Sequence, residues 1–211
     1  MIGIIDYGMG NLFSVSKALE RLDVSYFISD DIEELQKADG LILPGVGAFK
    51  DAMNLLESKG LSKFIVDYVN AGGYLLGICL GMQLLFDESE ENGRWKGLSL
   101  LPGRIVRLSG IDKQGCSYKV PHMGWNKLQF KRNDPIINAC QENHVYFVHS
   151  YYLQTPEDDV IIATADYYQC VPAIVGRGTV SGMQFHPEKS GSLGMSLLNN
   201  YLQLVEKKVK A

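Results

Sequence analysis

Short apolar runs alternate with amphipathic stretches along the first half of the chain, and glycine or proline separates many of them. The apolar runs predict buried strands at residues 1–5, 24–28, 40–43 and 74–78. Apolar residues at helical spacing predict helices after residue 11 (Leu12, Val15, Leu19, Leu22) and at residues 32–37, 48–56 and 61–69. Strands that alternate with helices in this way favour an α/β fold with a mostly parallel sheet flanked by helices.

The pattern changes after Phe86. Residues 87–97 are polar and acidic, which indicates a surface connection. Short segments separated by turn residues then predict strands, as an antiparallel or mixed extension of the sheet, at residues 104–108, 118–120, 125–130, 145–148, 160–165, 173–177 and 180–185. A last helix is expected at 193–205, followed by a basic tail. We therefore expect a single domain, residues 1–211, with a β-rich second half.

Composition narrows the choice of partners and compartment. The 211 residues are 46% hydrophobic and 21% charged, which is ordinary for a globular protein, and the net charge of −4 gives no electrostatic reason to expect nucleic acid. No apolar run is long enough to span a membrane and no secretory signal is recognisable, so we expect a cytoplasmic protein. The cysteines, at 79, 116, 140 and 170, form no C-x-x-C pair, so we expect no zinc or other metal, and no cofactor.

The segment Gly77-Ile78-Cys79-Leu80-Gly81 joins a predicted strand to a predicted helix and has the form of a nucleophile elbow. Glycines on both sides relieve the crowding of a sharp turn, and the following helix start favours a thiolate. The N–H of Leu80 would form one arm of an oxyanion hole, and Gln83 would share the helix face with Cys79 and reach substrate. The alternative is a buried cysteine on an ordinary strand.

A cysteine nucleophile needs a base and a group that orients the base. Of the four histidines, only His186 stands two residues before a carboxylate, Glu188, directly after a predicted strand. Pro187 between them stiffens the turn, so the imidazole and carboxylate are expected to complete a Cys–His–acid triad. A loop histidine beside a solvated carboxylate is the alternative for this motif taken alone.

Other strand ends supply candidates for binding. Ser150 and Tyr151 follow a predicted strand and are candidates for substrate contacts, whereas His149 before them is better explained as a hydrogen-bonded, half-buried histidine than as a proton-transfer group. Residues 44–47 (PGVG) end a parallel strand, so their N–H groups could supply a second oxyanion arm, or could simply form a tight turn. The glycine-rich loop at residues 6–11 lacks a complete phosphate-binding motif, and we do not favour that function.

Together these motifs resemble the class I (triad-type) glutamine amidotransferases. GICLGMQ and HPE are shared across that class. IDYGMGNL, PGVGAF, KVPHMGWN, VYFVHSYY and GMQFHPEKS resemble more specifically the glutaminase subunits of imidazole glycerol phosphate synthase, from histidine biosynthesis. These blocks extend over almost the whole chain, and the resemblance implies a flavodoxin-like sheet.

The resemblance also implies a role for each matching residue. It implies a glutaminase that forms a γ-glutamyl thioester. The matching residues are Cys79 as nucleophile, His186 as general base and acid, Glu188 as orienting group, Gly47 and Leu80 as oxyanion donors, and Gln83, Ser150 and Tyr151 as glutamine ligands. The peptide at Val46 would rotate to complete the oxyanion hole. The sequence alone does not give the orientation of this peptide in the resting state.

The implied partner is a (β/α)8 cyclase in a heterodimer, which receives ammonia and makes imidazole glycerol phosphate and the purine intermediate AICAR. Asn11, Trp125, Tyr146 and Lys189 match positions at that junction. Two alternatives remain from the sequence: a glutaminase subunit of another pathway, and a catalytically silent scaffold subunit of the same fold. The sequence suggests only packing roles for Cys116, Cys140 and Cys170.

Overall fold

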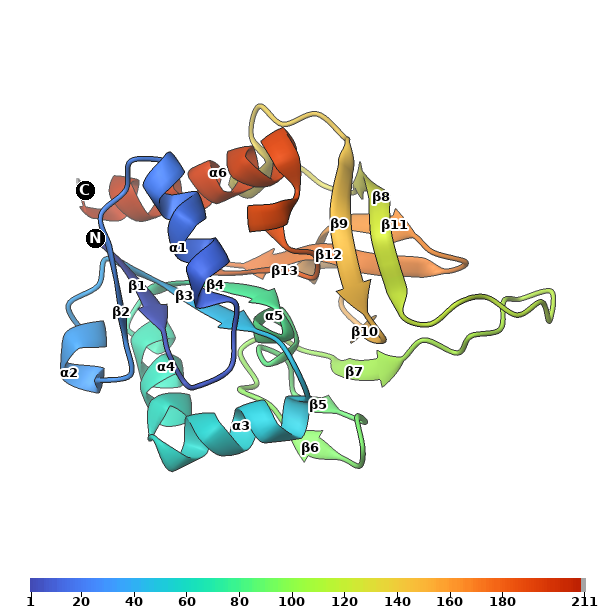
Figure 1. Ribbon diagram of the computed structural model, residues 1–211, viewed down its shortest axis with the longest axis horizontal. Coiled ribbons are helices and arrows are strands. Elements are labelled where there is room, and N and C mark those ends of the chain that lie inside the picture. The colour runs from blue at the N-terminus through green and yellow to red at the C-terminus, as the bar shows by residue number, and fades with distance from the viewer. Residues whose placement is uncertain (210–211) are drawn as a thin grey trace.

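The computed structural model describes residues 1–209 (Figure 1), so the last two residues of the expected domain 1–211 lie outside the described part. The helices are α1 (Leu12–Arg21), α2 (Ile32–Leu35), α3 (Phe49–Ser58), α4 (Leu61–Asn70), α5 (Leu80–Gln83) and α6 (Gly191–Val209), with 3-10 turns η1 (Pro135–Ile137), η2 (Asp158–Val160) and η3 (Pro187–Lys189). The strands are β1 (Ile2–Ile5), β2 (Tyr26–Ser29), β3 (Gly40–Gly45), β4 (Tyr74–Cys79), β5 (Glu88–Ser89), β6 (Trp95–Lys96), β7 (Arg104–Arg107), β8 (His122–Phe130), β9 (His144–His149), β10 (Tyr151–Gln154), β11 (Ile161–Asp166), β12 (Cys170–Arg177) and β13 (Val180–Met183).

The main sheet has a parallel half and an antiparallel half. Over residues 1–209 its nine strands run in the order β2-β1-β3-β4-β13-β12-β11-β8-β9. The first five strands are parallel, in the 2-1-3-4-5 order of flavodoxin-like folds, and the remaining pairings are antiparallel. The predicted α/β fold with a mixed extension is therefore confirmed. A smaller sheet, β10-β7-β5-β6, lies beside it.

Helices cover both faces of the parallel half, as Figure 1 shows, with α1 and α6 on one side and α3 and α4 on the other. Side-chain alternation along the strands explains this arrangement. On β3, Ile42 packs with residues of α1 and α6, whereas Leu41 and Leu43 pack with α3 and α4. In β1, β3 and β4 both faces are buried and the residues are almost all apolar, and this continuous pattern is what made these strands recognisable in the sequence.

The helix after the elbow is much shorter than its apolar spacing suggests. It ends at Gln83, and the carbonyls of Leu84 and Leu85 accept hydrogen bonds from Leu98 and Leu100 instead of continuing a helix. Long-range backbone pairing therefore replaces the helical ladder after one turn.

Several strand predictions need correction. Residues 118–120 form no strand, because the Tyr118 N–H bonds to the Gly110 carbonyl within a long loop that extends away from the molecule between β7 and β8 (Figure 1). The second strand starts at Tyr26 because the Val24 N–H still bonds to Leu19 at the end of α1. Strand β10 was missed altogether. The short strands β5 and β6 lie within 87–97, which we expected to be a surface connection and for which we predicted no strand.

Helix α5 lies in backbone contact with the sheet. A Cβ placed on Gly81 would lie 1.8 Å from the Leu43 carbonyl oxygen, and one on Gly77 would lie 2.6 Å from the Gly81 carbonyl oxygen. Real Cβ atoms do not approach other atoms this closely, so only glycine permits α5 to sit against β3 and β4. The flanking glycines of the elbow are thus required for packing.

We expect Gly81→Ala to destabilise the fold more than a glycine substitution that only strains the backbone. Because the clash is with a backbone oxygen, the cost should reach about 3 kcal/mol or more, and the melting temperature of a chain of this size should fall by roughly 6–12 °C. Gly72→Ala is the matched control, because Gly72 has a φ of +84° with nothing within 4 Å of its would-be Cβ. Its loss should be about 2–4 °C, and equal losses in the two variants, measured by thermal unfolding, would contradict the packing argument.

Candidate active site

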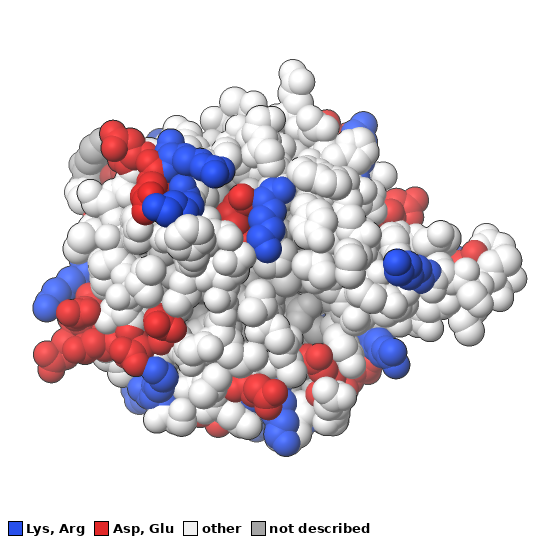
Figure 2. Space-filling view, viewed as in Figure 1, with Lys and Arg blue, Asp and Glu red and all other residues white. Residues whose placement is uncertain are grey.

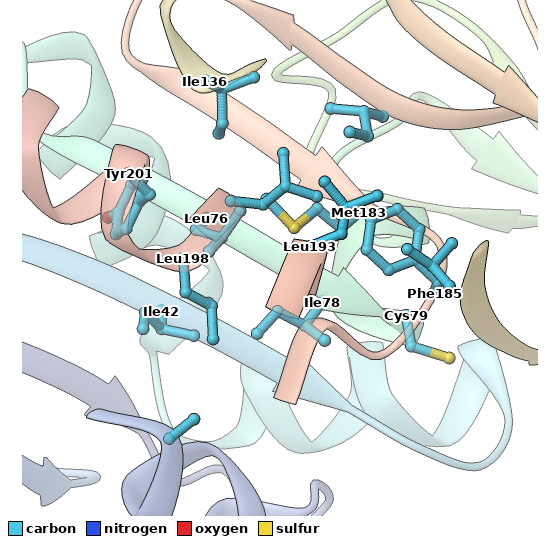
Figure 3. Close-up of a cluster of buried hydrophobic side chains, with 14 of the residues drawn as sticks. Ile42, Leu76, Ile78, Cys79, Ile136, Met183, Phe185, Leu193, Leu198 and Tyr201 are labelled. Carbon is cyan, nitrogen blue, oxygen red and sulfur yellow. The ribbon is translucent and has the colours of Figure 1, made fainter. Parts of the chain in front are cut away.

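Three parallel strands end side by side where the candidate residues lie. In the register, Cys79 at the end of β4 pairs with Gly45 at the end of β3, and Ile78 pairs with Met183 at the end of β13. The segment after β13 leads within three residues to His186, so the topology brings the elbow and the His-Pro-Glu turn together. Figure 3 shows Cys79 at the edge of a buried apolar cluster with its sulfur directed away from Ile78.

Cys79 has a backbone conformation that is rare for a residue with a side chain. Its φ is 56° and its ψ is −111°, and its surface is only 7% exposed. Such conformations cost of order 1–3 kcal/mol and persist only where the surroundings enforce them. The sharp turn from β4 into α5 therefore has the strained geometry of a nucleophile elbow.

His186 is held from its backbone as well as its ring. Its N–H donates to the Tyr146 carbonyl (3.1 Å), and its carbonyl accepts from the Ser190 hydroxyl (2.6 Å). Its Nδ1 lies 2.8 Å from Oε1 of the fully buried Glu188 carboxylate. The imidazole is thus fixed in position and oriented by Glu188.

The ring of His186 carries a proton at neutral pH. Burial lowers the pKa of His186, but its interactions with Cys79 and with the Glu188 carboxylate outweigh burial and raise this pKa to about 9. An imidazolium beside the sulfur is the partner that a reactive thiolate needs. Cys79, His186 and Glu188 therefore form one row, in which the His186 ring is hydrogen-bonded to Glu188 and shares the cavity wall with Cys79.

A cavity of about 460 Å³ opens over this row. Cys79 and His186 line it. The other expected site residues that line it are Gly47, Leu80, Gln83, Ser150, Tyr151 and Lys189. Gly47 has a φ of +101°, which suits glycine alone, so the loop after β3 adopts its path beside Leu80 without strain.

The remaining expected residues lie outside the cavity. Asn11 accepts a hydrogen bond from the Ser14 N–H and so caps α1. Trp125 and Tyr146 face each other across β8 and β9, with ring centroids 6.1 Å apart, and the Trp125 side chain is 58% exposed. The structure does not bring these three residues into the group around Cys79, although the Tyr146 carbonyl does hold His186.

Glu91 lines the cavity and was missed in the sequence. Its carboxylate accepts from the Phe49 N–H (2.7 Å) at the start of α3, next to the loop that carries Gly47. We had assigned it to an exposed acidic connection, and no spacing signal marks it out. Tyr7 was also missed: its buried hydroxyl has no hydrogen-bond partner among residues 1–209, and burial and the nearby charge of Cys79 raise its pKa.

His149 lines the same cavity and is buried and hydrogen-bonded. Its environment matches the interpretation favoured from the sequence, except that it is more buried than expected.

Residues 1–209 contain no group of three or more His, Cys, Asp or Glu side chains placed to hold a metal ion. Within the same range, no helix combines the length and apolarity needed to cross a membrane. The four cysteines are free thiols. On the face drawn in Figure 2, acidic and basic side chains are interspersed, and the basic ones form no continuous stripe.

Comparison with known families decides the classification. The family profile described as glutamine amidotransferase class-I matches residues 3–204. The chain belongs to the class I glutamine amidotransferases. This confirms the resemblance drawn from the motifs, and the chain is therefore an amidotransferase enzyme.

Curated relatives cover this amidotransferase from end to end. Proteins named imidazole glycerol phosphate synthase subunit HisH are 65% identical in Halalkalibacterium halodurans, over 100% of this chain and 99% of the relative. In Bacillus subtilis the identity is 56%, over 100% of both chains. Among solved structures, a glutamine amidotransferase crystal structure has a TM-score of 0.77 at 20% identity, over 97% of this chain and 98% of that chain. PurLQS from Thermotoga maritima has a TM-score of 0.72 at 20% identity, with the same coverage. These structures share the fold.

We expect the His186 ring to titrate near pH 9 in NMR spectra, and Cys79→Ala or Glu188→Gln to lower that pKa, because each removes a group that favours the charged ring. Cys116→Ala, which removes an exposed thiol, is the control and should leave the titration unchanged.

The raised pKa of His186 also determines how the stability of the fold depends on pH. Because the pKa is raised on folding, its stabilising contribution is present below the unfolded value of 6.5 and is lost as the pH rises through about 9. A ring that titrates near pH 6.5 in the unmodified chain would contradict the ion-pair geometry.

Proposed function

We propose that this chain is the glutaminase subunit of imidazole glycerol phosphate synthase, acting as one amidotransferase domain. The observation that carries the proposal is the row Cys79–His186–Glu188 at a strained elbow under a cavity of about 460 Å³. The full-length identity of 56–65% to proteins named imidazole glycerol phosphate synthase subunit HisH supports the choice of pathway.

In the first half of the reaction, the Cys79 thiolate attacks the side-chain amide carbon of glutamine and a C–S bond forms. The N–H groups of Leu80 and Gly47 stabilise the negative oxygen that develops. The His186 imidazolium gives its proton to the departing nitrogen as the C–N bond breaks, which releases ammonia and leaves a γ-glutamyl thioester.

In the second half, the neutral His186 ring accepts a proton from a water molecule that attacks the thioester. The C–S bond breaks, glutamate leaves, and the thiolate–imidazolium pair is restored. Glu188 keeps the ring in one orientation through both halves and stabilises its charged form. Gln83, Ser150 and Tyr151, which line the same cavity, hold the glutamine.

The ammonia passes to a (β/α)8 cyclase partner, which makes imidazole glycerol phosphate and AICAR. Free ammonia is protonated in water and lost as a nucleophile, so a sealed contact between the subunits is required. Trp125, whose ring contacts that of Tyr146, supports such a contact because this large aromatic residue is left mostly exposed. We assign Asn11 and Lys189 to the same junction on the family resemblance alone. We also propose a cytoplasmic location, which the free cysteines support.

We expect Cys79→Ala to abolish ammonia release from glutamine, since no other group can form the thioester. The measurement is glutamate and ammonia production by the complex with the cyclase. Cys116→Ala, at an exposed thiol far along the chain, should retain full activity. If Cys79→Ala made ammonia at the rate of the unmodified chain, the proposed function would be wrong.

We further expect the isolated chain to hydrolyse glutamine weakly, and the cyclase with its nucleotide ligand to stimulate it. One oxyanion donor is worth about a hundred- to a thousandfold in rate, so rotation of the peptide at Val46 can account for a stimulation of this size. An ammonia assay with and without cyclase and ligand measures it. Full-rate hydrolysis by the purified chain alone would contradict this regulation.

A further inference from the structure

Two histidines outside the catalytic row form a hydrogen-bonded pair beside the cavity. His122 on β8 and His149 on β9 are direct partners in the antiparallel register, and Nδ1 of His122 lies 2.9 Å from Nε2 of His149. Both side chains are buried. The pair thus belongs to β8 and β9, the last two strands at one end of the main sheet, and its His149 member lines the cavity.

Each end of the pair has its own polar partner. On the cavity side, Nδ1 of His149 lies 2.9 Å from the Tyr151 carbonyl oxygen. On the outer side, Nε2 of His122 lies 3.2 Å from Nδ2 of Asn126, which also donates to the Asp166 carbonyl (2.8 Å). The hydrogen bonds therefore form an unbroken row from Asn126 to Tyr151, which is separate from the catalytic row of Cys79, His186 and Glu188 and is the row meant below.

The chemistry of the partners fixes the direction of this row. Burial lowers the pKa of His122 to about 4, and burial together with His122 lowers that of His149 to about 3, so each ring is neutral and carries one proton at pH 7. A backbone carbonyl can only accept, so His149 donates from Nδ1 and accepts at Nε2. His122 must then donate from Nδ1 and accept from Asn126 at Nε2, which is what an amide nitrogen can supply.

The row ends on the same carbonyl that orients Gln83. Nε2 of Gln83 donates to the Tyr151 carbonyl (3.0 Å) and to Oε1 of Gln184 (3.0 Å), which uses both protons of its amide. The oxygen of Gln83 is then the end of its side chain left to accept a hydrogen bond in the cavity. A shift of the Tyr151 carbonyl would remove the contact that sets this orientation.

We propose that His122 and His149 are positioning residues for glutamine: through the Tyr151 carbonyl they hold Gln83 with its side-chain oxygen presented to the α-ammonium group of the substrate. This inference rests on the proposed function, because it takes glutamine as the ligand of the cavity. Neither histidine takes part in proton transfer, and His186 alone does so.

The surroundings of His122 permit a conservative test. Its ring stacks between Phe147 and Tyr167, with centroids 4.5 and 3.9 Å away, so His122→Phe keeps the stacking and removes the proton donor. We expect the KM for glutamine to rise roughly three- to tenfold, the effect of one net hydrogen bond, with kcat little changed. His122→Asn, whose amide nitrogen takes the place of Nδ1, should restore most of the affinity.

The decisive experiment compares two alkylating agents on Cys79 in the complex with the cyclase. A chloroketone analogue of glutamine must occupy the glutamine site, whereas iodoacetamide needs only the thiolate. We expect His122→Phe to slow labelling by the analogue severalfold and to leave labelling by iodoacetamide unchanged. His144→Phe, an exposed histidine on the same strand as His149, is the control and should change neither rate.

The outcomes separate the two proposals. Equal slowing of both reagents, or no slowing of either, would overturn the positioning role and leave the glutaminase function standing. If the analogue failed to label Cys79 in the unmodified complex, the proposed function itself would fail. Should His122→Phe not fold, Asn126→Ala at the outer end of the row gives the same test. It should raise the KM by about two- to fivefold, and an unchanged KM would overturn the inference.

Discussion

The backbone contact between α5 and the strand beside it determines the geometry of the site. Because Gly81 lies directly against the Leu43 carbonyl, the chain must turn at once after β4, and Cys79 is forced into its rare conformation. Pairing of β4 with β3 and with β13 on its two sides holds that strain in place. The Cys79 sulfur is therefore held at the edge of the hydrophobic core, where the cavity begins, and does not lie inside the core.

Two buried histidines line the cavity, one charged and one neutral at pH 7, and the groups beside each ring explain the difference. His186 faces a sulfur and a carboxylate, which favour its proton, whereas His149 faces a neutral ring and a carbonyl, which cannot compensate for burial. One ring is therefore suited to moving protons and the other to holding a fixed hydrogen-bond direction. Burial alone would have lowered the pKa of both.

The sequence predicted the features that depend on local pattern and missed those set by distant partners. The apolar strands, the elbow at Cys79 and the His-Pro-Glu turn were recognisable because burial on both faces and sharp turns restrict residue types. The length of α5 was not, since bonds from Leu98 and Leu100 end it. Glu91 was not predicted either, because its partner, the Phe49 N–H, lies 42 residues away and leaves no periodic signal.

The antiparallel half of the sheet is part of the site, because one of its strands supports the turn that carries His186. A flavodoxin-like sheet that ended at β13 would present Cys79 and His186, but the turn that carries the histidine would have no strand beside it to hold its backbone. Strand β9 supplies that support, because the Tyr146 carbonyl binds the His186 N–H and the Tyr146 N–H binds Ser190. The neighbouring residue of β8, Trp125, is exposed beside Tyr146. A protein that bound at Trp125 would therefore contact the residue paired with Tyr146, and Tyr146 is the residue whose carbonyl holds the general base, His186.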